Sequence, residues 1–186
     1  MPFPLLSKIF LSKYETVITG LGRRKPSVNE AIISAVNNGT SLLNYTGHGS
    51  PNVWADERVF QRTISLPRFD NDKYFFLTAA TCDFGRYDDP NIVSGTEEML
   101  LMEGRGMIGG FSSARLVYAE QNAAINEEFY RNIFNNRGTA PIGDAYLVTK
   151  QKKTQTNDEK FHLFCDPALV LNLPSLPVNI DKVNDQ

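Results

Sequence analysis

Two residues that suit acyl-transfer chemistry each follow a short, mostly apolar run. His48 comes two residues after the run Ser41–Thr46, and Cys82 comes directly after the run Tyr74–Thr81. A neighbouring base or positive charge raises the thiolate fraction of a cysteine, and an imidazole can also protonate a leaving amine. A fold that brings these two side chains together would therefore hold a cysteine/histidine dyad.

Gly47 and Gly49 flank the histidine and let the chain turn sharply, so that backbone N–H groups come close enough to a substrate to form an oxyanion site. A structural interpretation stays open for each reactive residue alone, as a small core cysteine or a surface histidine. The two histidines and two cysteines of the sequence have no zinc-site spacing, and no strand is followed by a phosphate-binding glycine motif. We therefore expect no metal and no cofactor.

The elements that must position this pair indicate an α/β fold. Apolar continuity, rather than alternation, is typical of strands that are covered on both faces of a parallel sheet. Such strands alternate here with segments of helical spacing, so we expect a three-layer α/β/α sandwich with a mostly parallel sheet. Ligands gather outside the carboxyl ends of such strands, and consecutive strands are usually neighbours. Both side chains would then face one crevice.

The expected elements follow from the same patterns. We predict strands at 8–11, 41–46, 74–81, 107–112 and 168–171, and helices at 27–38, 94–102, 118–135 and 141–153. Ser27 and Glu30 have the spacing of a capping box at the first helix, and residues 19–26 before it are predicted to form a polar loop.

The composition excludes several classes of protein. The 186 residues, 41% of them hydrophobic, suit one domain with its own core. The 19 lysines and arginines are offset by 21 acidic residues, so no basic excess is present to bind nucleic acid. No apolar stretch is long enough to span a bilayer, and the first residues lack the pattern of an export signal, which predicts a soluble chain. Two cysteines are too few for a disulfide framework.

Several blocks of residues resemble the gingipain-type cysteine peptidases. The blocks are Pro26–Ile32, Asn44–Ser50, Trp54–Val59, Thr78–Pro90, Ser94–Leu101, Ser112–Tyr118 and Phe164–Leu169. The histidine–glycine block followed by the alanine–threonine–cysteine block is much more specific than either block alone. Within this family, the blocks are most similar to the PorU sortases of type IX secretion.

The resemblance implies a caspase-like catalytic domain at residues 1–173, followed by a tail at 174–186. It implies that Cys82 is the nucleophile, that His48 protonates the leaving amine, and that the N–H groups of Gly49 and Cys82 are the oxyanion donors. The reaction would be hydrolysis of a peptide bond, or transfer of the acyl group to another amine.

For the PorU-type sortases, the implied substrates are secreted proteins whose C-terminal signal domain is removed at the cell surface. Polypeptide substrates and other secretion-system proteins are therefore the implied partners, and the outer membrane surface is the implied location. The rival hypothesis is a non-catalytic pseudo-peptidase that binds proteins of the secretion system.

The resemblance also implies that the chain holds roughly the second half of the catalytic fold, with the N-terminal part of the fold missing. Gingipains orient their histidine with an upstream acid, and neither of the upstream acids here, Glu15 and Glu30, matches it. A sheet cut in this way would expose an edge strand and an apolar face, which predicts homodimerisation.

Three further residues have two interpretations each, and two have one. Trp54 is either a wall of the substrate pocket or a plug in the core. Asp83 and Asp88 either select a cationic substrate side chain or stabilise the loop after Cys82, with arginine pairing as the default for such acids. We expect Cys165 to be a buried, inert thiol and His162 to be structural.

Overall fold

A four-stranded sheet forms the centre of the protein. In the computed structural model, which describes residues 6–135 and 139–173, the strands are β3 (Leu42–Thr46), β6 (Phe75–Ala80), β7 (Met107–Ser113) and β8 (Phe161–Phe164). Their order in the sheet is β3-β6-β7-β8. The first three strands are parallel, and β8 is antiparallel to β7.

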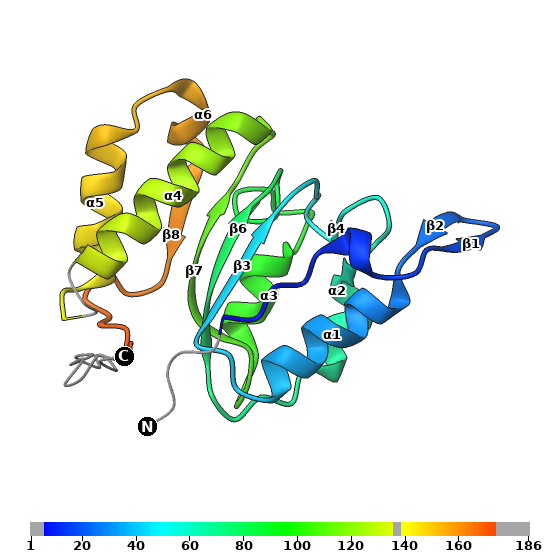
Figure 1. Cartoon of the computed structure of the whole chain (residues 1–186). Coiled ribbons are helices and arrows are strands. Elements are labelled where there is room, and N and C mark those ends of the chain that lie inside the picture. Colours follow the sequence, from blue (N-terminus) through cyan, green and yellow to red (C-terminus); the bar gives the residue numbers. More distant parts are fainter. Residues whose placement is uncertain (1–5, 136–138, 174–186) are drawn as a thin grey trace, which may run out of the picture.

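Helices lie on both faces of this sheet (Figure 1). One layer contains α1 (Pro26–Asn37), α2 (Arg62–Ser65) and α3 (Gly95–Leu101), and the other contains α4 (Ala119–Asn135), α5 (Ile142–Lys152) and α6 (Thr156–Glu159). Two small hairpins, β1–β2 (Val17–Thr19 with Gly22–Arg24) and β4–β5 (Val53–Trp54 with Phe60–Gln61), and the 3-10 turns Leu11–Lys13 and Leu66–Arg68 complete the described elements. The expected three-layer α/β/α fold is confirmed.

Strand β6 is buried along its whole length and divides the core into two halves. Phe75, Leu77 and Ala79 pack into the cluster beneath α1 and α3, whereas Phe76 and Ala80 pack into the cluster beneath α4 and α5. Successive side chains of a strand point to opposite faces, so a strand between two apolar layers needs an unbroken apolar run.

The three parallel strands and the four longer helices that the sequence predicts are confirmed to within one residue at each end. The capping box at α1 is wrong. The N-cap of α1 is Lys25, which makes no side-chain capping bond, and Pro26 occupies the first turn. Glu30 instead accepts two hydrogen bonds from the guanidinium of Arg68, at 2.6 and 2.5 Å.

Three other local predictions are wrong. The segment 8–11 is not a strand, and the loop predicted at 19–26 contains β2 of the first hairpin. The run Ala168–Leu171 is not a strand either, because it serves the start of α5: the carbonyls of Pro167 and Leu169 accept the N–H groups of Gly143 and Ile142, at 2.9 and 2.8 Å. The last strand is β8, which the sequence analysis did not predict.

Among the described residues, no helix has the length and apolar character needed to cross a membrane. In the same part of the chain, no group of three or more histidine, cysteine or acidic side chains is placed to hold a metal ion. The predicted tail at 174–186 lies outside the described residues.

The layer formed by α4 predicts a dependence of stability on alkaline pH. Burial raises the pKa of Tyr130 to about 12. An unfolded tyrosine titrates at about pH 10, so the unfolded chain loses this proton first and the free energy of unfolding falls between about pH 10 and 12. We expect Tyr130→Phe to remove this loss, so that the variant gains about 1 kcal/mol relative to the parent between pH 8 and pH 11 in urea unfolding. The same change at the exposed Tyr74 is the control, and an equal gain there would contradict the assignment to Tyr130.

Candidate active site

The register of two neighbouring strands places His48 and Cys82 at the same edge of the sheet. Strands β3 and β6 are adjacent and parallel, with Thr46 opposite Ala80. His48 and Cys82 each lie two residues beyond this pair, and the ladder continues past it, because the N–H of Gly47 donates to the carbonyl of Ala80 at 3.4 Å. Adjacent strands lie about 4.8 Å apart. The prediction that these two strands are neighbours is confirmed.

The loop that carries His48 is held through the backbone carbonyl of this residue. The carbonyl of His48 accepts the N–H of Ala55 at 2.8 Å and the hydroxyl of Tyr45 at 2.7 Å. Burial raises the pKa of Tyr45 well above its ordinary value, so this hydroxyl keeps the proton that it donates. The imidazole of His48 is exposed, which leaves it free to meet a bound molecule.

Gly49 lies directly against the end of β6. A Cβ atom at this position would overlap the hydroxyl of Thr81 and lie 3.0 Å from the carbonyl oxygen of Val53. Only glycine therefore lets the loop after β3 approach the residue that precedes Cys82. This contact joins the two halves of the candidate site.

Two backbone donors are unused at this edge. Within the described part of the chain, neither the N–H of Gly49 nor the N–H of Cys82 donates a hydrogen bond to a protein group. The bridge between Gly49 and Trp54 uses the groups on either side, from Ser50 to Val53 and from Ala55 to His48. An oxyanion site requires such free donors beside the reacting atom.

The sulfur of Cys82 is half-buried and contacts the backbone of a single residue. Its Sγ lies 3.4 Å from the carbonyl oxygen of Val117 and 3.5 Å from the N–H nitrogen of the same residue. Val117 belongs to the segment after β7, so a third parallel strand contributes to the site. Val117 could not be found from the sequence, because a backbone contact has no side-chain signature.

The comparisons with known proteins agree with this architecture. Residues 1–172 match the family model described as Peptidase family C25. This chain belongs to peptidase family C25. A search of curated proteins finds no match to the C25 chain. The family consists of cysteine peptidases of the gingipain type, which confirms the family resemblance of the residue blocks, whereas nothing in these comparisons addresses the likeness to PorU.

Solved structures share the fold of this C25 chain. The crystal structure of the Arg-specific cysteine proteinase gingipain R (RgpB) matches with a TM-score of 0.64 and 22% identity, over 77% of this chain and 36% of that one. The complex of the Porphyromonas gingivalis RgpB pro- and mature domains matches with a TM-score of 0.64 and 21% identity, over 77% of this chain and 37% of that one. A structure described only as a protease matches with a TM-score of 0.61 and 20% identity, over 78% and 41%. The C25 chain thus spans well under half the length of these relatives.

Trp54 does not form the wall of an open pocket. Its side chain is 1% exposed and stacks on Tyr45 with ring centroids 4.4 Å apart, and it also packs against Phe60 and Phe84. The alternative interpretation, a plug in the core, is therefore the one that the structure supports. Because Tyr45 binds the carbonyl of His48, Trp54 supports the histidine loop from inside the core.

Asp83 and Asp88 do not form an open acidic pocket. Asp83 is buried, with a left-handed backbone at φ 55°, and its N–H donates to the carbonyl of Arg115 at 3.2 Å. Asp88 forms a two-pronged ion pair with Arg115, which lowers the pKa of that carboxyl and neutralises its charge. Arginine pairing, the default expectation for these acids, holds for Asp88, and Asp83 serves the turn after Cys82.

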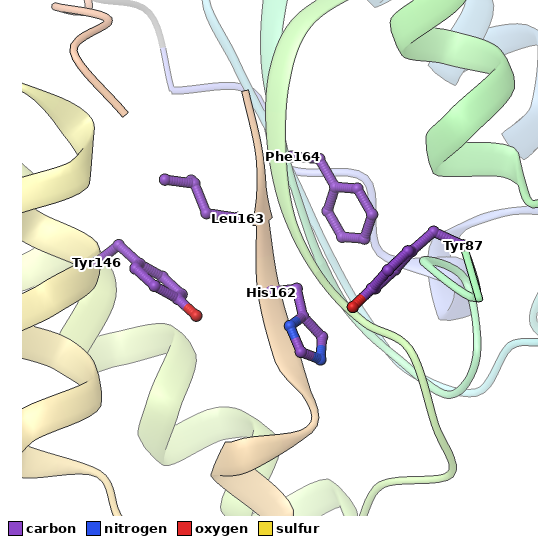
Figure 2. A pocket seen from close by; sticks show the side chains of 5 residues that line it. All are labelled: Tyr87, Tyr146, His162, Leu163 and Phe164. Atoms are coloured by element: carbon purple, nitrogen blue, oxygen red, sulfur yellow. The ribbon is translucent and has the colours of Figure 1, made fainter. Parts of the chain in front are cut away.

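Cys165 lies beside Gly109 near the start of β7, and His162 lies on β8, two strands away from β6 in the sheet. Burial raises the pKa of the half-buried Cys165 thiol to about 11, which agrees with the expected inert thiol. His162 lies on β8 and faces Tyr87, with Leu163 and Tyr146 on the other side of the strand (Figure 2). Together with Phe164 they line a hollow of about 300 Å³ whose lining contains neither His48 nor Cys82.

The contact between Gly49 and Thr81 predicts a pair of compensating substitutions. We expect Gly49→Ala to lower the free energy of unfolding by about 1–3 kcal/mol, because the new methyl overlaps Thr81 in a packed interior. Adding Thr81→Ala removes the overlapping atoms, including a buried hydroxyl without a partner among the described residues, and should recover part of the loss. Urea unfolding of the two single variants and the double variant measures this coupling, and strict additivity would contradict the contact.

The left-handed backbone of Asp83 predicts that the conformation of this residue matters more for stability than its charge does. A left-handed residue other than glycine is strained by about 1 kcal/mol, and asparagine tolerates this region better than alanine. We therefore expect Asp83→Ala to be less stable than Asp83→Gly by about 1 kcal/mol, and Asp83→Asn to lie between them. A loss of reactivity confined to substrates with Lys or Arg side chains in Asp83→Asn would instead restore the acidic-pocket interpretation.

Proposed function

We propose that this chain carries the nucleophile and the proton donor of a C25 cysteine peptidase. Cys82 is the nucleophile, His48 protonates the leaving amine, and the N–H groups of Gly49 and Cys82 bind the oxyanion. The observation that supports this most strongly is the register of β3 and β6, because His48, Gly49 and Cys82 follow the ends of two adjacent parallel strands and the N–H groups of the last two are unused within the described residues.

The reaction proceeds through a thioester. The Cys82 thiolate attacks the carbonyl carbon of a peptide bond, and the oxygen takes up the negative charge beside the two N–H groups. The C–N bond then breaks as His48 gives its proton to the departing amine. Water attacks the thioester in the second half-reaction, His48 takes a proton from that water, and the carboxylic acid leaves as the thiolate re-forms.

A finer proposal is that the enzyme is a sortase of type IX secretion at the cell surface. In that role the second nucleophile is an amine instead of water, and the polypeptide substrates are secreted proteins that lose a C-terminal signal domain. The residue blocks most similar to the PorU sortases support this proposal. Other secretion-system proteins would then be the partners, and self-association of the chain stays a prediction.

Labelling by a peptidyl electrophile directed at thiols tests the dyad. We expect the parent chain to be labelled at Cys82 much faster than at Cys165, and His48→Gln to slow this labelling by about 10²-fold or more, because the imidazole assists formation of the thiolate. Hydrolysis of a peptide pool should be lost in Cys82→Ala. Matched controls are Cys165→Ala and His162→Gln, which change the same residue types on or beside β8 and should leave both readouts unchanged.

The same peptide assay separates the two outcomes of the thioester. Mass spectrometry of reactions with an added primary amine would show amide products for a sortase and free acids alone for a hydrolase. Equal labelling of the two cysteines, independent of His48, would refute the dyad and favour the non-catalytic pseudo-peptidase.

A further inference from the structure

The backbone of one residue, Val117, faces the sulfur of Cys82 with both its carbonyl and its N–H. Val117 is 8% exposed, and its carbonyl oxygen and N–H nitrogen lie 3.4 and 3.5 Å from Sγ. A neutral thiol donates its weak S–H to the carbonyl, whereas a thiolate accepts the N–H. Hydrogen bonds to a charged partner are about twice as strong as neutral ones, so the N–H bonds a thiolate more strongly than a thiol.

The segment that carries Val117 is fixed by the elements at the far edge of the sheet. Ala114 donates its N–H to the carbonyl of Lys160 at 2.9 Å, and the ammonium of Lys160 donates to the carbonyl of Leu116 at 2.8 Å. The N–H of Tyr118 donates to the side-chain oxygen of Asn157 at 2.8 Å. Val117 thus lies between two residues that are tied to α6 and to the residue before β8.

A second connection ties the same segment to the loop after the cysteine. The N–H of Asp83 donates to the carbonyl of Arg115, and the N–H of Gly85 donates to the carbonyl of Ser113 at 2.9 Å. The ion pair between Arg115 and Asp88 joins the same two segments at the protein surface. The residues after β6 are therefore joined to the end of β7 and the residues after it by two backbone hydrogen bonds and an ion pair.

We propose that the N–H of Val117 stabilises and orients the Cys82 thiolate, and that Lys160 is a positioning residue that holds the Leu116–Val117 peptide, which carries this N–H, against the sulfur. The inference rests on the proposed function for its biological meaning, since it concerns the same nucleophile. Its physical content is separate, because it predicts the reactivity of a thiol toward a small reagent.

The direct test removes the Val117 N–H. Val117→Pro lacks this donor, and Val117→Ala keeps it while trimming the same buried side chain, so Val117→Ala is the matched control. We expect iodoacetamide to alkylate Cys82 about 5-fold more slowly at neutral pH in Val117→Pro, the effect of one modest hydrogen bond, and within 2-fold of the parent in Val117→Ala. Peptide mass spectrometry separates Cys82 from Cys165.

The second test leaves the site untouched and changes the residue that holds it. Lys160→Met removes the bond to Leu116, and the control Lys73→Met changes an exposed lysine just before the opposite end of β6. We expect Lys160→Met to slow alkylation of Cys82 about 3-fold at neutral pH and to match the parent at high pH, where the thiolate forms in both chains. Lys73→Met should match the parent throughout, and Lys160→Met decides the question if Val117→Pro does not fold.

The outcomes distinguish this inference from the proposed function. Parent-like alkylation of Cys82 at every pH in both Lys160→Met and folded Val117→Pro overturns the role of Val117, even if His48-dependent labelling is present. A slower rate in Lys160→Met that persists at high pH also overturns it, because lost access rather than lost thiolate would be the cause. Conversely, His48-independent labelling refutes the dyad, while a Val117-dependent pH profile would still support the contact.

Discussion

The hydrogen-bonded register between β3 and β6 is the constraint on which the candidate site depends. A shift of one residue would move His48 about 3.3 Å along the strand and turn its side chain toward the other face of the sheet. The register is held by burial, because Phe75, Leu77 and Ala79 fill one core cluster while Phe76 and Ala80 fill the other. A slipped β6 would exchange these two sets between clusters that are shaped for different partners. The apolar core therefore sets the geometry of the polar edge.

Beyond the ends of the strands, backbone groups of the following loops support the residues of the candidate site. Main-chain atoms of Gly49 lie against the side chain of Thr81, and main-chain atoms of Val117 lie against the sulfur of Cys82, so the segments after three successive parallel strands meet here. Main-chain groups are well suited to this purpose, since their positions follow from the strands and lose little conformational freedom. The aromatic stack of Trp54 on Tyr45 extends this support to the histidine loop through the bond from Tyr45 to His48.

Strand β8, the antiparallel edge of the sheet, has a different function from the three parallel strands. Strand β8 contributes no residue to the proposed dyad, and the thiol of the neighbouring Cys165 is held neutral by burial. Strand β8 has a structural role at the corner where it meets α6, because Lys160 and Asn157 form hydrogen bonds there with the segment after β7. This corner is far from His48 in the sequence, yet the short segment after β7 links it to the sulfur of Cys82. The chain as a whole spans about a third of the length of RgpB.

The sequence by itself determined the elements whose residues serve one purpose. Continuous apolar runs predicted β3, β6 and β7, and the ends of the first two runs predicted His48 and Cys82 at the same end of the sheet. Tertiary structure alone decided the role of residues whose sequence pattern fits two different roles. Ala168–Leu171 is as apolar as a strand, but its carbonyls bind the first turn of α5, while the shorter run at β8 pairs with β7. Glu30 has capping spacing but pairs with Arg68, and Trp54 is buried in the core instead of lining a pocket. The contact of Val117 left no trace in the sequence, because any residue except proline supplies the same peptide group, and only the packing of three strands determines where that group points.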